Sequence, residues 1–177
     1  MRIIAGELKG RIFSSPHTNK THPMSDKARG ALFNVLGDIE GMSVLDSFAG
    51  SGALGLEALS RGASRATFID SDRVAAQTMK SNTEALGVSA RTKVIHSSVG
   101  AWLDTSPDVI FDLVLCDPPY DHLQPALITR LCRATKKDGI FALSWPPATE
   151  PLSLEEFTLL EQRNYGDATL VFYRRVG

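Results

Sequence analysis

Strand-forming segments and helix-forming segments alternate along this chain from residue 43 onward. Strands are expected at SVLDSF, RATFID, RTKVIHS, FDLVLCD (with the apolar run Phe111, Leu113, Val114 and Leu115) and GIFALSW, and helices between them at about 52–61, at 72–86, near Trp102 and at 123–136. Runs that are apolar at consecutive positions are typical of strands buried on both faces of a parallel sheet. Because parallel strands are joined by helical crossovers, the pattern predicts an α/β fold with a doubly wound sheet.

The two ends of the chain add to this core. FTLLEQR and ATLVFYRR are separated by a short turn, so we expect two more strands, one of them antiparallel, and seven strands in all. At the other end, RIIAG and KGRIFSS flank a glycine-containing turn and predict a β-hairpin. Ser25 is expected to cap a helix whose apolar face holds Ala28, Ala31, Leu32 and Val35.

Composition favours one domain that needs no cross-link. The chain has 177 residues, 43% of them hydrophobic and 22% charged, and only two cysteines, Cys116 and Cys132, in apolar surroundings. The four histidines are scattered, so no metal site is predicted, and no apolar run is as long as a membrane span. We therefore expect a single domain, 1–177, in a cytoplasmic protein that acts as a monomer away from membranes.

Positive charge is concentrated near the N-terminus. Residues 1–30 carry a net charge of +4 and the remaining residues −5, within a total of −1. A basic segment on an acidic body suggests an anionic partner such as nucleic acid, with a solvated surface as the alternative. The basic residues concerned are Arg2, Lys9, Arg11, Lys20, Lys27 and Arg29.

A glycine-rich loop follows the first strand of the alternating region. In VLDSFAGSGALG, Gly50, Gly52 and Gly55 match the GxGxxG spacing, and Asp70 ends the next strand twenty residues after Gly50. Such glycines allow a ligand to approach the backbone, and the later carboxylate can accept ribose hydroxyls. The glycines could also serve only a tight turn, but the placement of Asp70 favours a nucleoside site.

Asp46 distinguishes between possible cofactors. It precedes the glycines at the end of the strand, where a carboxylate would repel a pyrophosphate but can accept from an ammonium group. This favours S-adenosylmethionine over a nicotinamide dinucleotide, as does a chain too short for a separate substrate domain. The residues expected at the donor are Asp46, Phe48, Ala49, Gly50, Ser51, Gly52, Asp70, Ser71, Ser98 and Val99.

The fourth strand ends in Asp117-Pro118-Pro119-Tyr120. An exocyclic amine of a base is a poor nucleophile until its two N–H bonds meet acceptors, which the Asp117 carboxylate and the Pro118 carbonyl can supply. Consecutive prolines fix the backbone and remove competing donors, and the Tyr120 ring offers a stacking surface. A simple strand-ending turn is the alternative, but the glycine loop on a neighbouring strand favours a catalytic motif of Asp117, Pro118, Pro119 and Tyr120.

With these motifs the chain resembles class I methyltransferases that act on exocyclic amines. RIIAGELKGR, HPMSDKARGALFN and YGDATLVFYRR narrow the resemblance to the RsmD family of bacterial 16S rRNA guanine-N2 methyltransferases, over essentially the whole chain. The resemblance implies a Rossmann-like, S-adenosylmethionine-dependent fold with a catalytic core at 25–177 and a basic, RNA-gripping hairpin and loop at 1–24. It also implies methylation of guanine 966 of 16S rRNA, on an assembling or assembled 30S particle.

The chain departs from the family pattern in three places. It has His22-Pro23-Met24 where the family has Arg-Pro-Thr, Gly30 where it has Glu, and Ser98 where it has Asp or Asn. Two other classes of function stay open at this point. One is a DNA or other RNA base amino-methyltransferase, for which no target-reading insertion is evident; the other is a non-catalytic RNA-binding assembly factor, which would not need intact Asp46, Asp70 and Asp117.

Overall fold

The computed structural model describes residues 1–16 and 23–177. Its helices are α1 (Asp26–Leu36), α2 (Ala53–Ser60), α3 (Arg73–Ala85), α4 (Val99–Thr105) and α5 (Pro125–Leu131), with 3₁₀ turns η1 (Ser89–Arg91), η2 (Tyr120–His122) and η3 (Cys132–Ala134). Its strands are β1 (Ser43–Asp46), β2 (Arg65–Asp70), β3 (Thr92–His96), β4 (Phe111–Cys116), β5 (Thr135–Trp145), β6 (Phe157–Tyr165) and β7 (Ala168–Arg175).

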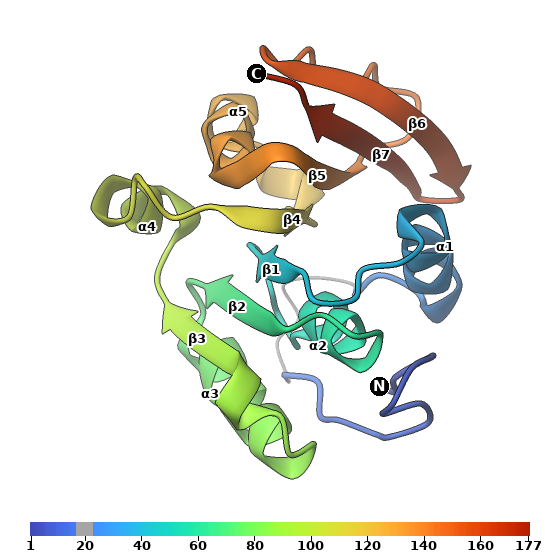
Figure 1. Ribbon diagram of the computed structural model, residues 1–177, viewed down its shortest axis with the longest axis vertical. Helices are drawn as coiled ribbons and strands as arrows, with labels where there is room; N and C mark the ends of the chain where they lie inside the picture. Colours follow the sequence, from blue (N-terminus) through green and yellow to red (C-terminus); the bar gives the residue numbers. More distant parts are fainter. Residues whose placement is uncertain (17–22) are drawn as a thin grey trace.

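All seven strands form one sheet in the order β3-β2-β1-β4-β5-β7-β6 (Figure 1). The first five are parallel, whereas β7 pairs with β5 and β6 in the antiparallel sense. The predicted α/β sheet with an antiparallel C-terminal hairpin is therefore confirmed. Because β1 lies between β2 and β4, the strand order reverses there, and the carboxyl ends of these strands meet at one edge, where such folds bind ligands.

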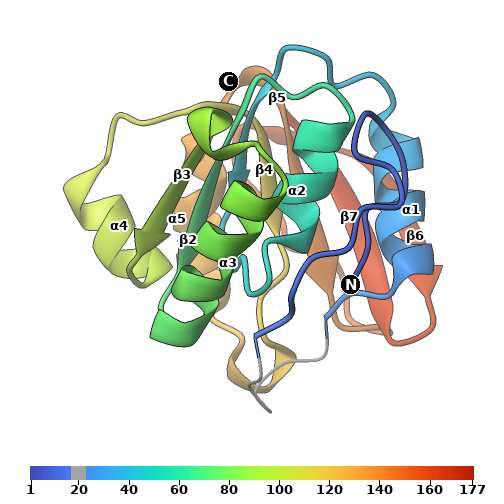
Figure 2. The ribbon, with the colours of Figure 1, turned by 90° about the horizontal axis from the view of Figure 1, so that it is seen from below.

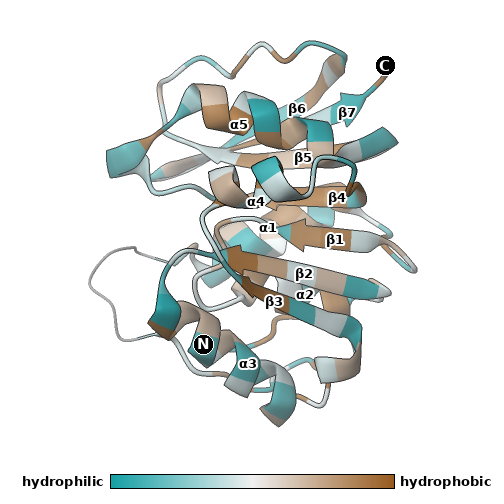
Figure 3. Ribbon diagram, turned by 90° about the vertical axis from the view of Figure 1, so that its left-hand side faces the viewer, coloured by the Kyte–Doolittle hydropathy of each residue, from teal (hydrophilic) through white to brown (hydrophobic). Residues whose placement is uncertain are grey.

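Helices cover both faces of the sheet, whose strands carry many hydrophobic residues (Figure 3). A cluster of buried hydrophobic side chains lies on each face. On one face, side chains of α1, α2 and α3 pack with alternate strand residues such as Val44 and Leu115. On the other face, α4 and α5 pack against the intervening residues, including Leu45 and Val114. This division follows from the strand period of two, which sends neighbouring side chains to opposite faces.

Helix α2 lies unusually close to the sheet. A Cβ at Gly55 would sit 2.3 Å from the ring of Phe68 on β2, so any side chain there would clash. The contact fixes the start of α2, and with it the glycine loop, against the strand that ends in Asp70.

The predicted N-terminal hairpin is present in a reduced form. Arg2 and Ile12 make one antiparallel bridge, and Ile3 exchanges backbone hydrogen bonds with Arg11 and Gly10. The segment lies along α2, with α1 nearby (Figure 2). No ladder forms among its described residues because several of its N–H groups donate to α2 instead.

The helix predicted at 123–136 is wrong in its extent. Only Pro125–Leu131 is α-helical, and β5 begins at Thr135, earlier than the GIFALSW segment. The register between β4 and β5 shifts after Phe111, and Asp138 has a positive φ of 63°. This bulge allows a polar, helix-like stretch to join the strand, which hydrophobic periodicity does not predict. The other helix predictions, including the Ser25 cap, agree with the structure.

Candidate functional site

A hollow of about 210 Å³ lies at the carboxyl edge of the parallel strands. The loops after β1, β2, β3 and β4 form its walls, together with α5 and η2. The lining residues are Ser47, Phe48, Asp70, Ser71, Ser97, Ser98, Val99, Pro118, Pro119, His122, Gln124, Leu127 and Ile128. The hollow therefore stands at the position that the strand order defines for a ligand.

Five residues predicted for the donor line this hollow, and five do not. The lining ones are Phe48, Asp70, Ser71, Ser98 and Val99, and the others are Asp46, Ala49, Gly50, Ser51 and Gly52. The glycine loop nevertheless adjoins the hollow, because Gly50 N donates to Asp70 Oδ2 over 2.8 Å. The second oxygen of Asp70 accepts from Asp72 N at 2.7 Å, so this carboxylate joins the loop to the start of α3.

Asp46 is buried at the end of β1, with 1% of its surface exposed. Its Oδ2 accepts from Gly55 N over 2.9 Å, while Oδ1 has no hydrogen-bond partner among the described residues. Burial raises the pKa of Asp46 to about 7; the Gly55 bond opposes the shift and the charges of Asp117 and Asp70 add to it. A buried acceptor without a partner fits a cationic ligand group.

The glycine loop also leaves room for a ligand. Gly50 has a φ of 54°, and a Cβ built there would meet no other atom within 4 Å. The free oxygen of Asp46 can accept from the ammonium of S-adenosylmethionine, and the partly buried carboxylate of Asp70, in the wall of the hollow, can accept from its ribose hydroxyls. The open side of Gly50 leaves room for the donor beside the loop. The residues present therefore fit this donor.

Ser98 lines the hollow and also caps the N-terminus of α4. Its Oγ accepts from Ala101 N at 3.2 Å and caps α4, so the hydroxyl is already engaged. Six further residues line the hollow that the sequence does not single out: Ser47, Ser97, His122, Gln124, Leu127 and Ile128. Ser47 and Ser97 adjoin the predicted Phe48 and Ser98, but no local pattern shows that α5 turns Leu127 and Ile128 toward the hollow.

The predicted catalytic motif, Asp117 to Tyr120, follows β4 directly, and its two prolines line the hollow. Burial raises the pKa of Asp117 to about 6, and the negative charge of Asp167, in the turn between β6 and β7, adds to the shift. The nearby Ser144 hydroxyl acts in the opposite direction. Among described residues no group donates to the Pro118 carbonyl, which stays available as an acceptor.

Hydrogen bonds to the end of β5 hold Tyr120 in place. Its Oη lies 2.6 Å from Ser144 Oγ, where either oxygen can be the donor, and 3.1 Å from the Trp145 carbonyl, to which its one proton can turn instead. The residue is 36% exposed, and desolvation raises the pKa of its phenol to about 12. The hydroxyl is thus fixed and neutral while part of the ring faces solvent.

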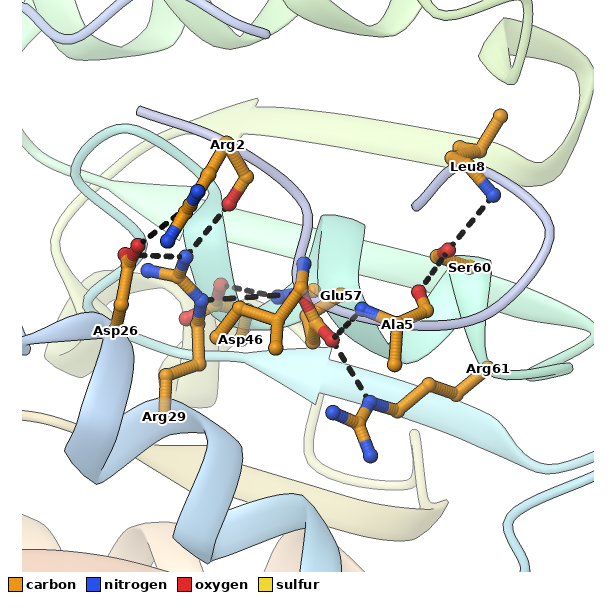
Figure 4. A network of polar contacts seen from close by, with 11 residues as sticks. Arg2, Ala5, Leu8, Asp26, Arg29, Asp46, Glu57, Ser60 and Arg61 are labelled. Carbon is orange, nitrogen blue, oxygen red and sulfur yellow. Dashed lines mark hydrogen bonds and ion pairs between the residues drawn. The ribbon is translucent and has the colours of Figure 1, made fainter. Parts of the chain in front are cut away.

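The N-terminal segment is fastened to α2 by side-chain groups (Figure 4). The carboxylate of Glu57 accepts from Ile4 N at 2.8 Å and Ala5 N at 3.0 Å. Ser60 Oγ accepts from Leu8 N and donates to Ala5 O. A third anchor is the buried Asn82 of α3, which exchanges two hydrogen bonds with the backbone of Ser14 and donates to Ser51 O in the glycine loop.

The basic residues predicted to contact RNA differ in their exposure to solvent. Arg2, Lys9, Arg11 and Lys27 are exposed, and Lys20 lies outside the described residues. Arg29 is 0% exposed, so its assignment as an RNA contact is wrong. It is directed into the protein because its Nη2 donates to Arg2 O and Asp26 Oδ1, and its Nε lies 3.9 Å from Glu57 (Figure 4).

No helix among the described residues is long and apolar enough to cross a membrane. In the same part of the chain, no group of three or more His, Cys, Asp or Glu residues is placed to hold a metal ion.

The sheet order, the glycine loop and the hollow at the strand switch define a Rossmann-like class I methyltransferase. A family model described as "Conserved hypothetical protein 95" matches residues 1–174. The chain is 33% identical to Ribosomal RNA small subunit methyltransferase D of Haemophilus influenzae, over 98% of this chain and 92% of that one. The solved structure of yhhF from Escherichia coli superposes with a TM-score of 0.88 and 30% identity, covering 99% and 98% of the two chains.

The chain belongs to the RsmD family of rRNA methyltransferases. The predictions of the family, of the class I fold and of S-adenosylmethionine as cofactor are thereby confirmed.

Proposed function

We propose that this chain transfers a methyl group from S-adenosylmethionine to the exocyclic N2 amine of a guanine in 16S rRNA, at the position equivalent to guanine 966. The observation that carries the proposal is the placement of Asp117-Pro118-Pro119-Tyr120, whose prolines line the same hollow as Asp70 and Phe48. The name of the Haemophilus influenzae relative supports the rRNA target.

The donor supplies an electrophilic methyl group, and residues of the chain prepare its acceptor. The Asp117 carboxylate and the Pro118 carbonyl each accept one N–H of the amine, which turns the nitrogen lone pair away from the base ring. Tyr120 presents part of its ring to a base, and such stacking contributes about 1–3 kcal/mol. This offsets much of the few kcal/mol needed to unstack the base.

The proposed binding site for S-adenosylmethionine consists of Asp46, the Phe48–Gly52 loop, Asp70, Ser71, Ser98 and Val99. Asp46 would accept from the ammonium, Asp70 from the ribose hydroxyls, and Val99 and its neighbours would enclose the adenine. The exposed Arg2, Lys9, Arg11 and Lys27 would contact rRNA phosphates. A cytoplasmic monomer acting on a 30S particle completes the proposal.

The test is methylation of 16S rRNA and of 30S particles from cells that lack this protein, followed by mass spectrometry of the nucleosides. We expect N2-methylguanine with the intact chain, and a loss of at least about 10²-fold in kcat with Asp117→Ala. Donor affinity, measured by calorimetry, should change little. The exposed neighbour Asp121 provides the control, since Asp121→Ala should retain activity.

Other products would replace the proposal. N6-methyladenine would identify an adenine methyltransferase, and methylation of DNA alone would identify a DNA enzyme. RNA binding without donor binding would identify an assembly factor. A near-normal rate for Asp117→Ala would remove the assigned role of the motif.

A further inference from the structure

Ser144 is a buried hydroxyl next to two residues of the predicted catalytic motif, Asp117 and Tyr120. It stands at the end of β5, is 2% exposed, and belongs to no sequence pattern identified above. Cys116 pairs with Leu143 across the parallel β4–β5 ladder, so Asp117 and Ser144 are the next positions on adjacent strands. From the other side, Tyr120 Oη lies 2.6 Å from Ser144 Oγ.

Ser144 and Tyr120 each carry one hydroxyl proton, and Asp117 carries none while it is ionised. Tyr120 has one proton and two neighbouring acceptors, Ser144 Oγ and the Trp145 carbonyl. Either oxygen of the Tyr120–Ser144 pair can be the donor. The orientation of this pair therefore depends on what Asp117 requires, because an ionised carboxylate only accepts and a protonated one can donate.

We propose that Ser144 is a positioning residue of the methyl-transfer reaction, which joins Asp117 and Tyr120 in one reversible chain of hydrogen bonds. The inference rests on the function proposed above. While Asp117 is ionised, Tyr120 donates to Ser144 and Ser144 donates to the carboxylate. The carboxylate is thereby directed at the substrate amine, and the Tyr120 ring is held at a fixed angle beside it.

The direction of these hydrogen bonds reverses when the reaction releases a proton. As the substrate nitrogen forms its bond to the methyl carbon, the carbon–sulfur bond breaks and the nitrogen becomes cationic. One N–H bond then breaks and its proton passes to Asp117, which becomes a neutral carboxylic acid. Ser144 now accepts from Asp117 and donates to Tyr120, whose proton turns to the Trp145 carbonyl. No hydrogen-bonding group is left without a partner, and no further base is required.

Several titratable groups face Asp117. Asp46 approaches from β1, Cys116 precedes it on β4, Tyr120 follows in η2, and Asp167 approaches from the β6–β7 turn. An unperturbed thiol or phenol is already neutral near pH 6, and burial raises the pKa of Cys116 and Tyr120 further, so neither adds a charge beside Asp117. Ser144 is not titratable, and its hydroxyl favours the ionised form of Asp117.

The experiment compares Ser144→Ala, Ser144→Thr and Ser43→Ala. Ser43 is a matched control: it is also 2% exposed in a strand, and its Oγ donates over 2.6 Å to a carboxylate, that of Asp112 at the opposite end of β4. Rates are measured from pH 5 to 9 at saturating donor and rRNA. The pKa of Asp117 is followed independently by carboxyl ¹³C NMR in the protein without substrates, with Asp117→Asn to assign the signal.

For Ser144→Ala we expect kcat about tenfold lower, a KM for the donor within about twofold, and the acidic limb of the rate profile about 1 pH unit higher. The Asp117 ¹³C titration should move in the same direction. Ser144→Thr should return the acidic limb of the rate profile to its wild-type pH. Ser43→Ala should lower thermal stability and leave the rate profile unchanged.

An unchanged limb and kcat in Ser144→Ala, or an equal shift in Ser43→Ala, would overturn the inference. If Asp117→Ala is inactive while Ser144→Ala behaves as the wild type, only the role of Ser144 fails. If Asp117→Ala is active, the proposed function fails as well.

Discussion

Asp46 shows how a single buried carboxylate can oppose stability. Its pKa is raised from 3.8 to about 7, chiefly by burial. The folded state thus holds the proton more tightly than the unfolded state does. As pH rises from about 4 to about 7, the unfolded chain ionises first, and stability falls over this interval.

We predict that Asp46→Asn is more stable than the wild type at pH 8, by roughly 2–4 kcal/mol, and that the difference shrinks toward pH 4. The amide oxygen can still accept from Gly55 N, so the start of α2 keeps its bond. Urea unfolding at several pH values measures the effect. The same variant should bind S-adenosylmethionine more weakly, because it loses the charge assigned to the ammonium. A stability difference independent of pH would contradict this account.

At the scale of elements, Glu57 joins the N-terminal segment to α2. We predict that Glu57→Gln lowers the free energy of unfolding by about 2–3 kcal/mol, because the new NH₂ group faces a backbone donor and the buried Arg29 and partly buried Arg61 lose their counter-charge. Hydrogen exchange should show faster exchange at Ile4 and Ala5 first. Glu84→Gln, on the exposed face of α3, is the control and should change stability by less than about 0.5 kcal/mol.

Elements with strong local signals were predicted well from the sequence. β1 to β4 lie where the sequence predicts strands, and Ser25, Gly52 and Asp72 mark the helix starts where the structure has them. The prediction fails where contacts between residues far apart in the sequence determine the local structure. The N-terminal segment, residues 1–14, here called the arm, forms one bridge rather than a ladder because Glu57 and Ser60, far along the chain, accept from its backbone N–H groups.

The candidate site divides in the same way. The positions of Asp70 and Pro118 at the strand ends follow from the motifs and the strand order. The burial of Arg29 and the contact of Ser144 with Tyr120 depend on packing between elements, which a basic or hydroxyl side chain does not reveal in the sequence.

At the scale of the whole molecule, the exposed charge of the arm should govern RNA binding. We predict that replacing Arg2, Lys9 and Arg11 together by Ala weakens rRNA binding and makes the plot of log K against log salt shallower by about 2–3 units. A matched control is the double replacement of Arg65 and Lys93, which are exposed near the amino ends of β2 and β3. An unchanged slope in the triple variant would show that the arm's charge is only solvated surface.

The reversed direction of β7 brings a C-terminal turn to the catalytic edge. Asp167 raises the pKa of Asp117, so Asp167→Asn should move the acidic limb of the rate profile downward, opposite to the effect of Ser144→Ala. Because Asp167 is exposed, we expect a shift of only about 0.3–0.5 unit, smaller at high salt. Asp138→Asn, an exposed site with positive φ that asparagine tolerates, is the control and should leave the limb in place.

The way in which the arm is anchored has a consequence for how this protein can evolve. Glu57 and Ser60 bind main-chain atoms of the arm, so these contacts do not depend on the identity of its outward-pointing side chains. Two positions are exceptions: a Cβ at Gly6 would lie 1.8 Å from Ser60 O, and Arg11 Nη2 donates to Ala85 O of α3. Mutation can therefore vary an exposed residue such as Lys9, and with it the proposed contact with RNA, while the scaffold that presents it is inherited unchanged.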